Sequence, residues 1–324
     1  MKAPYKSLFM FLMITSTLML MSSSNWLVMW MSLEINMMGF IPLMYYNNTT
    51  HESEATVKYM VPQSIGSTLF IMGFTLSTYS NLMQTLIPIA LCLKLGAAPL
   101  HFWFPPVMAN LALIPAFLLL TWQKIAPILA ISSLTQPMIK KLLLIAVITA
   151  LWGSIGGLNQ TDIRLLLTYS SIAHTGWMIT SIMSPKPIML LYLTTYILIN
   201  LSIMMTLWTK NYKAHKMLLS QNHGEPFHTF MLSATILSLG GLPPLTGFIM
   251  KAMVVLYSEV KPMILAMLIM SATMSLYYYL TLMFSTVLQT SKTTFKYMNT
   301  TNKTLLSLFS LSQLLPLLLL LLFF

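Results

Sequence analysis

Residues 86–103 read LIPIALCLKLGAAPLHFW, an apolar stretch that carries one lysine, Lys94, followed by two helix breakers, Gly96 and Pro99. A proline inside a helix removes a backbone hydrogen bond and collides with the preceding turn. Lipid cannot replace that bond, so a broken helix persists at membrane depth only where protein or a water-filled cavity covers it. The stretch therefore predicts a broken helix in the interior of a membrane protein.

A second stretch of the same kind lies in the C-terminal half. Residues 239–257 read LGGLPPLTGFIMKAMVVLY, in which the helix breakers Gly240, Gly241, Pro243 and Pro244 precede one lysine, Lys251. Paired interrupted segments in corresponding places are typical of inverted-repeat transporters. We therefore expect two repeats, each with one broken helix.

The rest of the chain is as apolar as these two stretches. Of its 324 residues, 57% are hydrophobic and 7% are charged, whereas soluble domains carry about 25% charged residues. Apolar runs of about 20 residues, long enough to cross ~30 Å of hydrocarbon, recur along its length. The composition predicts an all-α, polytopic membrane protein without a soluble catalytic domain.

We expect about eleven transmembrane helices in a single transmembrane domain, residues 1–324. The first repeat half covers residues 1–132, the second covers 133–288, and an extra C-terminal helix follows at 304–323. The first span is expected to be retained, because no small-residue cleavage site of a signal peptide follows it. The expected spans are 5–22, 25–46, 55–79, 82–104, 108–132, 138–158, 162–183, 187–209, 227–257, 262–288 and 304–323.

The lysines and the arginine of the predicted loops are distributed unevenly. Ten fall on the side of the N-terminus and four on the opposite side. Basic residues concentrate on the negative side of a membrane, so the N-terminus is predicted to face the matrix or the cytoplasm. The ten are Lys2, Lys6, Lys58, Arg164, Lys210, Lys213, Lys216, Lys292, Lys296 and Lys303, and the four are Lys140, Lys141, Lys186 and Lys261.

Four ionisable residues stand alone inside apolar spans: Glu34, Lys94, Lys124 and Lys251. A charge at bilayer depth costs at least ~2.5–3.5 kcal/mol, so it normally faces a partner or an aqueous path. Desolvation favours the neutral form of an amine, which would let a buried lysine load and release a proton. Three lysines and one glutamate on four helices therefore indicate a proton relay.

Each of the four residues also has a structural interpretation. Glu34 and Lys94 can form a fixed ion pair that holds two helices together. Lys124 can extend its amine to the membrane surface, although its depth in the span argues against this, and Pro127 is expected to loosen its helix. Lys251 can pair with Glu259 at the surface.

Two histidines are weaker candidates for the relay. His174 lies among hydroxyl-bearing residues in the seventh span, and it can either bridge two lysines through water or remain a neutral core histidine. His101 is expected to pack against Trp103 rather than to transfer protons. Asp162 and Arg164 are expected to cap and orient the seventh span.

The chain lacks the motifs of redox and metal chemistry. It contains no P-loop and no dinucleotide-binding glycine motif, and its single cysteine, Cys92, cannot hold an iron–sulfur cluster alone. No metal site is expected at the histidines of the polar loops, and no basic patch with interleaved aromatic residues indicates nucleic-acid binding. The loop histidines are His51, His215, His223 and His228.

Five stretches together resemble subunit 2 of mitochondrial NADH:ubiquinone oxidoreductase, respiratory complex I. Their order and spacing fit as well, and the broader relatives are antiporter-like subunits shared with multi-subunit sodium/proton antiporters. The chain differs from the usual pattern at Pro106, where a glutamate is common, and at Met250 and Ala252, which flank Lys251 in place of proline and tryptophan. The five stretches are MSLEINMMGFIPL (31–43), LKLGAAPLHFWFP (93–105), LTWQKIAP (120–127), GGLNQTDIRLLLTYSSIAHTGWM (156–178) and LSLGGLPPLTGFIMKA (237–252).

The resemblance implies a mitochondrially encoded, multi-pass subunit of the proton-pumping membrane arm in the mitochondrial inner membrane. It implies that Glu34, Lys94, Lys124 and Lys251 match the family's glutamate, its two central lysines and its terminal lysine. As a subunit of the proton-translocating NADH:ubiquinone reductase, the chain would itself carry out no redox catalysis. NADH, FMN, iron–sulfur clusters and ubiquinone would belong to other subunits, and the partners would be other membrane-arm subunits and lipids.

The sequence thus predicts a proton-translocation channel coupled to electron transfer elsewhere in the complex. Two alternatives stay open, an autonomous cation/proton antiporter and a purely structural membrane subunit.

Overall fold

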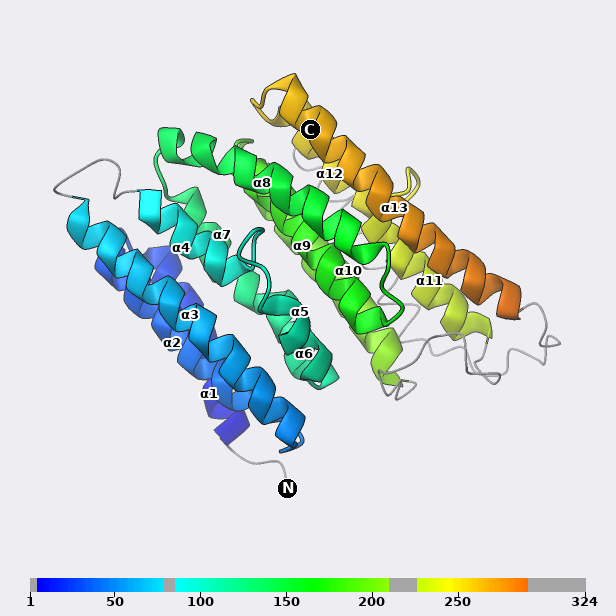
Figure 1. Cartoon of the computed structure of the whole chain (residues 1–324), viewed down its shortest axis with the longest axis horizontal. Helices are drawn as coiled ribbons and strands as arrows, with labels where there is room; N and C mark the ends of the chain where they lie inside the picture. The colour runs from blue at the N-terminus through cyan, green and yellow to red at the C-terminus, as the bar shows by residue number, and fades with distance from the viewer. Residues whose placement is uncertain (1–4, 78–84, 210–225, 291–324) are drawn as a thin grey trace. The chain divides into compact units, whose positions relative to one another are not determined.

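The computed structural model describes residues 5–77, 85–209 and 226–290, which form α-helices and no strand (Figure 1). The predicted eleventh span at 304–323 and the loop residues His215 and His223 lie outside this part of the chain. The described part contains six helical segments that are long and apolar enough to cross a membrane. They are Tyr5–Ser22, Trp26–Met44, Leu113–Ser132, Pro137–Gly157, Lys186–Trp208 and Pro262–Phe284.

The chain divides into two compact units, Met1–Thr149 and Ala150–Phe324. The first unit contains α1 (Tyr5–Ser22), α2 (Trp26–Met44), α3 (Thr50–Leu76), α4 (Leu86–Leu95), α5 (Phe104–Asn110), α6 (Leu113–Leu120) and α7 (Trp122–Ser132). The helix α8 (Gln136–Gly157) begins in the first unit and ends in the second. The second unit continues with α9 (Ile163–Ser181), α10 (Lys186–Thr209), α11 (Pro226–Gly240), α12 (Thr246–Tyr257) and α13 (Pro262–Thr290).

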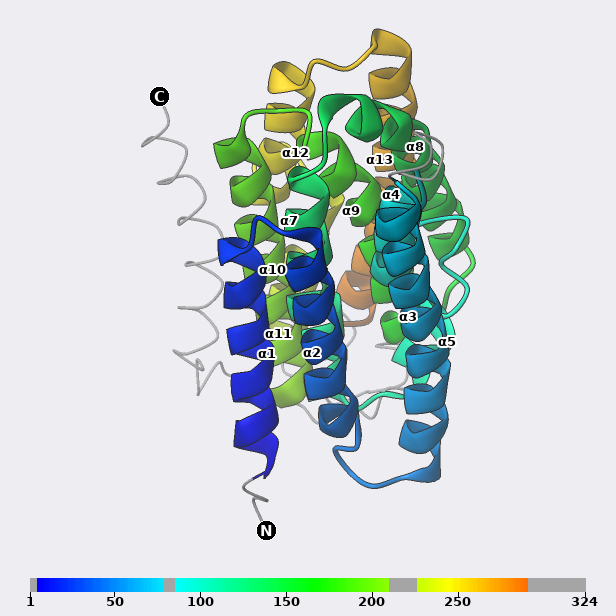
Figure 2. The same cartoon turned by 90° about the vertical axis from the view of Figure 1, so that its left-hand side faces the viewer.

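In the first unit, α3 packs against α2, α4 and α5, while α7 packs against α1, α2, α4 and α6. The start of α1 and the connection from α2 to α3 lie at one end of this unit, and the connection from α1 to α2 lies at the other (Figure 2). A capping box begins α3, in which the Thr49 hydroxyl accepts from the Glu52 backbone and the Glu52 carboxylate accepts from the Thr49 backbone. The polar start of α3 is thereby satisfied internally.

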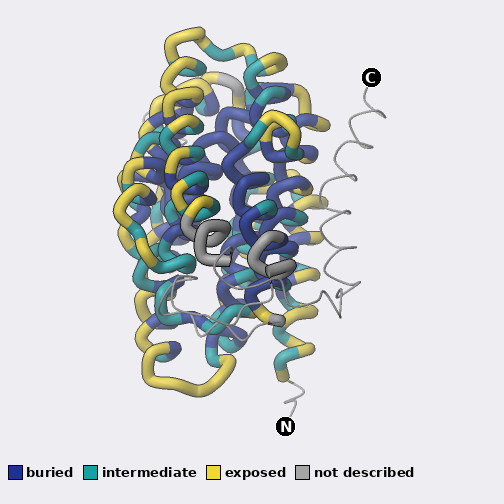
Figure 3. The backbone as a smooth tube through the Cα atoms, turned by 90° about the vertical axis from the view of Figure 1, so that its right-hand side faces the viewer, coloured by how far each residue is buried: buried dark blue, intermediate teal, exposed yellow. Residues whose placement is uncertain are grey.

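In the second unit, α9 is the central helix and contacts α10, α12 and α13. Fifteen of its residues are buried, including every one from Ser170 to Ser181, and such buried segments are dark blue in Figure 3. Glycines let α8 approach it closely, because a Cβ at Gly153 would overlap the backbone of Ala173. The candidate histidine on α9 therefore lies in the core of this unit.

Both predicted helix breaks are confirmed. The helix α4 ends at Leu95, and Gly96 takes the left-handed conformation (φ 71°) that commonly ends helices. The helix α11 ends at Gly240 and is followed by Gly241 with φ 87°. Each break leaves one lysine beside an interrupted helix.

The fifth predicted span, 108–132, is more interrupted than expected. It contains the end of α5 and all of α6 and α7, and the break nearest to Lys124 falls at Thr121. The Thr121 hydroxyl donates to the Phe117 carbonyl at 2.7 Å, beside the Thr121 backbone, which donates to the same carbonyl at 3.0 Å. Pro127 lies inside α7 without ending it, and the expectation that it loosens the helix locally stays a prediction.

Candidate functional site

Glu34 on α2 and Lys94 on α4 face each other in the first unit. The Oε1 atom of Glu34 lies 3.6 Å from the Nζ atom of Lys94, and their side chains are 20% and 3% exposed. Neither of these two atoms has a hydrogen-bond partner among the described residues. Because 3.6 Å exceeds the usual hydrogen-bond length of about 2.7–3.2 Å, the pair is held by charge attraction and both atoms keep bonding capacity.

The end of α4 is held by side chains from other segments. The Lys94 carbonyl accepts a hydrogen bond from the Gln63 side chain at 3.1 Å, and the Leu93 carbonyl accepts one from the Trp103 indole at 3.2 Å. The bond from Gln63 satisfies a carbonyl at the end of the broken helix, and the Leu93 carbonyl also accepts from the Gly96 backbone at 3.1 Å. Gly66 makes room for Lys94, since a Cβ there would lie 3.1 Å from Lys94 Cγ.

Lys124 lies in the first turn of α7 and is 2% exposed. Its amine is 5.9 Å from the centre of the Phe104 ring, within the range of a cation–π contact. Because the side chain is buried inside the first unit, the alternative of an amine that reaches the membrane surface does not hold in this structure.

A buried polar network joins three helices of the same unit. The Tyr59 hydroxyl donates to Gln123 Oε1 at 3.3 Å, and Gln123 Nε2 donates to Asn36 Oδ1 at 3.4 Å. Gln123 directly precedes Lys124, and Asn36 follows Glu34 by two residues. Sequence reasoning missed this network, although a glutamine and an asparagine beside lone charges in apolar spans were a signal for it.

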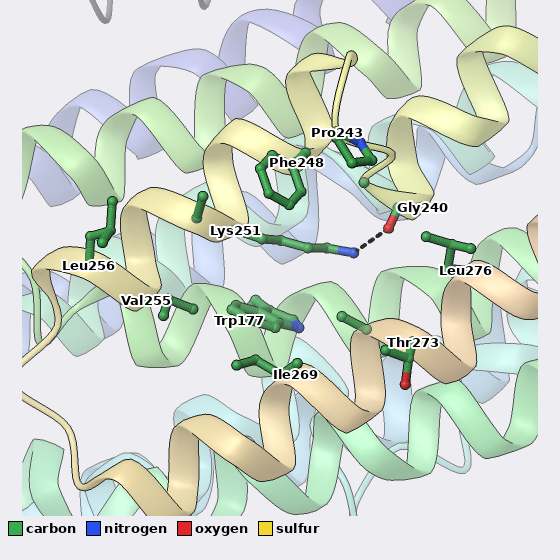
Figure 4. Close-up of a pocket in the computed structure, with 13 residues that line it drawn as sticks. Trp177, Gly240, Pro243, Phe248, Lys251, Val255, Leu256, Ile269, Thr273 and Leu276 are labelled. Carbon is green, nitrogen blue, oxygen red and sulfur yellow. Dashed lines mark hydrogen bonds between the residues drawn. The ribbon is translucent and has the colours of Figure 1, made fainter.

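Lys251 on α12 contacts the end of the broken helix α11 in the second unit. Its amine donates to the Gly240 carbonyl at 2.9 Å and lies 3.4 Å from the Leu239 carbonyl (Figure 4). These carbonyls form the C-terminal end of α11, where the helix dipole favours a cation. Lys251 is 8% exposed, whereas Glu259 is exposed, so the surface salt bridge between the two is absent from the described residues.

His174 and Lys251 line one small pocket in the second unit, which we call the polar pocket. The His174 Nδ1 atom lies 2.8 Å from the Tyr192 hydroxyl, and the residue is 3% exposed. The polar pocket is also lined by hydroxyl groups of α9 and α13, and no acidic side chain lines it. The hydroxyl groups belong to Ser170, Ser271, Ser275, Tyr278 and Tyr279.

Two predicted structural contacts, the packing of His101 and the cap at Asp162, can be compared with the structure. His101 stacks on Phe102, with ring centres 4.7 Å apart, while the Trp103 indole is directed to the Leu93 carbonyl. Asp162 occupies the residue before α9, but its side chain makes no capping hydrogen bond. The predicted cap at Asp162 is therefore wrong, whereas the packing of His101 against Trp103 stays a prediction.

The described residues offer few side chains that could bind a metal ion or a cofactor. In residues 5–77, 85–209 and 226–290, no three or more His, Cys, Asp or Glu residues gather as a metal site would require. The side chains described above carry carboxylate, amine, imidazole and hydroxyl groups, which can hold and pass protons.

Comparison with known proteins identifies the family of this chain. Residues 23–277 match the family described as NADH:quinone oxidoreductase/Mrp antiporter, transmembrane. The chain belongs to this family.

Individual relatives agree with this assignment. The chain is 37% identical to NADH-ubiquinone oxidoreductase chain 2 of Lumbricus terrestris, over 88% of each chain. It is 38% identical to the protein of the same name from Paradoxurus hermaphroditus, over 89% of this chain and 87% of the relative. It also shares its fold with a chain of respiratory complex I from Thermus thermophilus at a TM-score of 0.80 and 22% identity, covering 98% of this chain and 78% of that one.

Proposed function

We propose that this chain is a core membrane-arm subunit of respiratory complex I and contributes a proton-translocation channel. It is a multi-pass helical membrane protein, and its curated relatives are subunits of NADH-ubiquinone oxidoreductase. The observation that carries the proposal is the buried Glu34–Lys94 pair beside the break at the end of α4. A charge pair in an apolar fold must be desolvated, and ionisable residues at membrane depth therefore normally mark a functional site.

In the proposed relay, protons enter from the matrix side and reside on Lys94, whose charge is stabilised by Glu34. They pass to Lys124 and then towards Lys251, with His174 as a carrier in the second unit and His101 as a weaker candidate. The short distance between His174 and Tyr192 supports this role, since a hydroxyl can exchange hydrogen bonds with either ring form. Transfer through such groups requires no redox chemistry in this chain.

The energy would come from other subunits of the complex. Moving one charge against the membrane potential costs about 2.3 kcal/mol per 100 mV. NADH, FMN, iron–sulfur clusters and ubiquinone would be bound elsewhere, and electron transfer there would act on this chain through neighbouring membrane-arm subunits. We propose no cofactor for this chain and no redox catalysis by it.

The proposed architecture follows from the paired broken helices. Eleven spans would form two inverted five-helix repeats, residues 1–132 and 133–288, with an extra helix at 304–323. The protein would lie in the mitochondrial inner membrane with its N-terminus on the matrix side. The breaks after α4 and α11 support this arrangement, because each falls in the same place of its repeat.

An autonomous cation/proton antiporter is the second candidate, because the matched family includes Mrp antiporters. Purification in mild detergent separates the two functions. A complex I subunit should co-migrate with NADH oxidase activity, whereas a transporter acting alone should not.

The relay itself is tested by Lys124→Met in the assembled complex. Methionine matches the length of lysine, and replacing a buried charge by an apolar group of similar volume is often neutral for stability. We expect fewer protons pumped per NADH oxidised, with assembly intact. Lys141→Met, at an exposed lysine of α8, is the control and should leave the ratio unchanged. An unchanged ratio in Lys124→Met would leave a purely structural subunit.

A further inference from the structure

The polar pocket lies between two groups of the proposed relay, because His174 and Lys251 both line it. It leaves no space for a water molecule between its described side chains, and a water that bridges buried groups needs such space together with polar partners. A proton that passes from His174 to Lys251 in this structure therefore has to cross on a side chain. Hydroxyl groups can carry it, since they accept one hydrogen bond while they donate another.

The serine hydroxyls of the polar pocket are already engaged with their own helices. Each donates to the backbone carbonyl three residues before it, at 2.8, 2.6 and 2.8 Å for Ser170, Ser271 and Ser275. Such local bonds to the backbone occupy the single proton of the hydroxyl. A serine of this pocket would have to break its bond before it could pass that proton on.

The two tyrosine hydroxyls of the polar pocket are in a different state. Tyr278 and Tyr279 on α13 are 2% and 0% exposed, and neither hydroxyl has a hydrogen-bond partner of normal geometry among the described residues. A buried polar group without a partner is costly, and each case in a folded protein calls for an explanation. These two hydroxyls are able to accept a proton and to give up their own without breaking an existing bond.

The ring contacts place Tyr279 closer to Lys251 along the fold. The Tyr279 ring packs against Gly240, where a Cβ would lie 3.0 Å from its Cδ2 atom, and the Gly240 carbonyl accepts from the Lys251 amine at 2.9 Å (Figure 4). The Tyr278 ring packs instead against Gly157 on α8, where a Cβ would lie 2.9 Å from its Cε1 atom. Tyr279 is therefore the tyrosine at the break that holds Lys251.

We propose that the Tyr279 hydroxyl carries protons between His174 and Lys251, an assignment that rests on the proposed relay. The protonated imidazole of His174 gives one proton to the tyrosine oxygen, while the tyrosine's own proton passes to the neutral Lys251 amine. Tyr279 is neutral before and after the transfer, and one positive charge moves from the ring to the amine. The helix α13 then takes part in proton transfer although it contains no charged residue.

The test is Tyr279→Phe in the assembled complex, with the number of protons pumped per NADH oxidised as the readout. We expect this ratio to fall by the same amount as in Lys124→Met, because both variants interrupt one path. The melting temperature should stay at the wild-type value, since phenylalanine keeps the ring contact with Gly240 and the hydroxyl that is lost has no hydrogen-bond partner. A hydroxyl with a structural role would instead lower the melting temperature.

Tyr277→Phe is the matched control. It makes the same chemical change at the preceding turn position of α13, where the side chain is 62% exposed and lies outside the polar pocket. Its pumping ratio should equal that of the wild type. Tyr278→Phe removes the other hydroxyl without a partner and should lower the ratio less than Tyr279→Phe does.

The outcomes separate this proposal from the relay itself. If Tyr279→Phe kept the wild-type ratio while Lys124→Met lowered it, Tyr279 would not be a carrier and the relay would stand. Failed assembly or a lower melting temperature of Tyr279→Phe would also overturn the proposal, because the hydroxyl would then support the fold. An unchanged ratio in Lys124→Met would remove the relay and this step with it.

Discussion

Glu34 and Lys94 form an ion pair whose energetics differ from those of the surface pair Glu54–Lys58. The side chains of the surface pair are 54% and 41% exposed, whereas that of Lys94 is 3% exposed. Desolvation of a buried charge costs several kcal/mol, and only attraction to a partner offsets it. At 3.6 Å the attraction is not reinforced by a direct hydrogen bond. Small displacements of α2 or α4 would therefore change the strength of this attraction, as the proposed relay requires.

We predict that Glu34→Gln lowers the thermal stability of the complex more than Glu34→Gln combined with Lys94→Met. Breaking a buried pair by removing one partner costs about 3–5 kcal/mol, and the 20% exposure of Glu34 places the cost at or below the low end of that range. The double variant removes both charges and should recover part of the loss. Differential scanning fluorimetry of purified complexes would measure both shifts.

Glu54→Gln is the matched control, because it removes the carboxylate of the exposed pair. Exposed pairs contribute little to stability, so its melting temperature should equal that of the wild type. If Glu34→Gln behaved like this control, the buried pair would have no energetic role.

The burial of the lone charges could be predicted from the sequence, because an ionisable residue inside an apolar span is costly wherever it does not turn inward. The hydrogen bonds around these charges could not be predicted in the same way. The bond from Gln63 to the Lys94 carbonyl and the bond from Gln123 to Asn36 depend on how helices rotate against each other. A single-sequence pattern does not contain that rotation.

The ends of α4 and α11 could be predicted from the sequence, because a glycine and a proline lie close together at each of them. Gly96 and Gly241 both take positive φ, and prolines follow each of them within three residues. The break at Thr121 was missed because threonine does not by itself end a helix. Pro127 lies inside α7 and does not end it.

The contact of α12 with α11 gives a prediction at this scale. A Cβ at Gly247 would overlap the carbonyl oxygen of Ser238, a backbone atom that cannot rotate away. Gly247→Ala should therefore destabilise the second unit by about 1–3 kcal/mol, as overpacking does elsewhere. The measurement is the melting temperature and the yield of assembled complex.

Gly39→Ala on α2 provides the comparison, because the nearest atom to its Cβ is Met13 Cγ at 3.0 Å, in a flexible side chain. It should cost less than Gly247→Ala. A larger loss in Gly39→Ala would show that the approach of α12 to α11 is not the tightest constraint of the two.

The composition of the whole molecule was sufficient to predict an all-α membrane protein, because 7% charged residues cannot cover a soluble surface. Pockets were not predictable in the same way. Trp177 lies on α9, Lys251 on α12 and Ile269 on α13, yet all three line one pocket of about 500 Å³ in the second unit. These residues come together only when the helices pack. The spacing of residues in separate spans does not show which of them will be in contact.

The orientation of the whole molecule in the membrane can be tested with introduced cysteines, because the chain has a single cysteine. Cys92 is the only cysteine of the chain and is 2% exposed, so the wild-type chain should not react with a membrane-impermeant maleimide. Lys58 and Lys141 are exposed residues of the first unit that the charge distribution assigns to opposite sides of the membrane. With the N-terminus in the matrix, Lys58→Cys should be labelled only in inverted inner-membrane particles and Lys141→Cys only in intact mitoplasts. The opposite pattern would reverse the orientation, and proton entry at the Glu34–Lys94 pair would then have to begin from the other face.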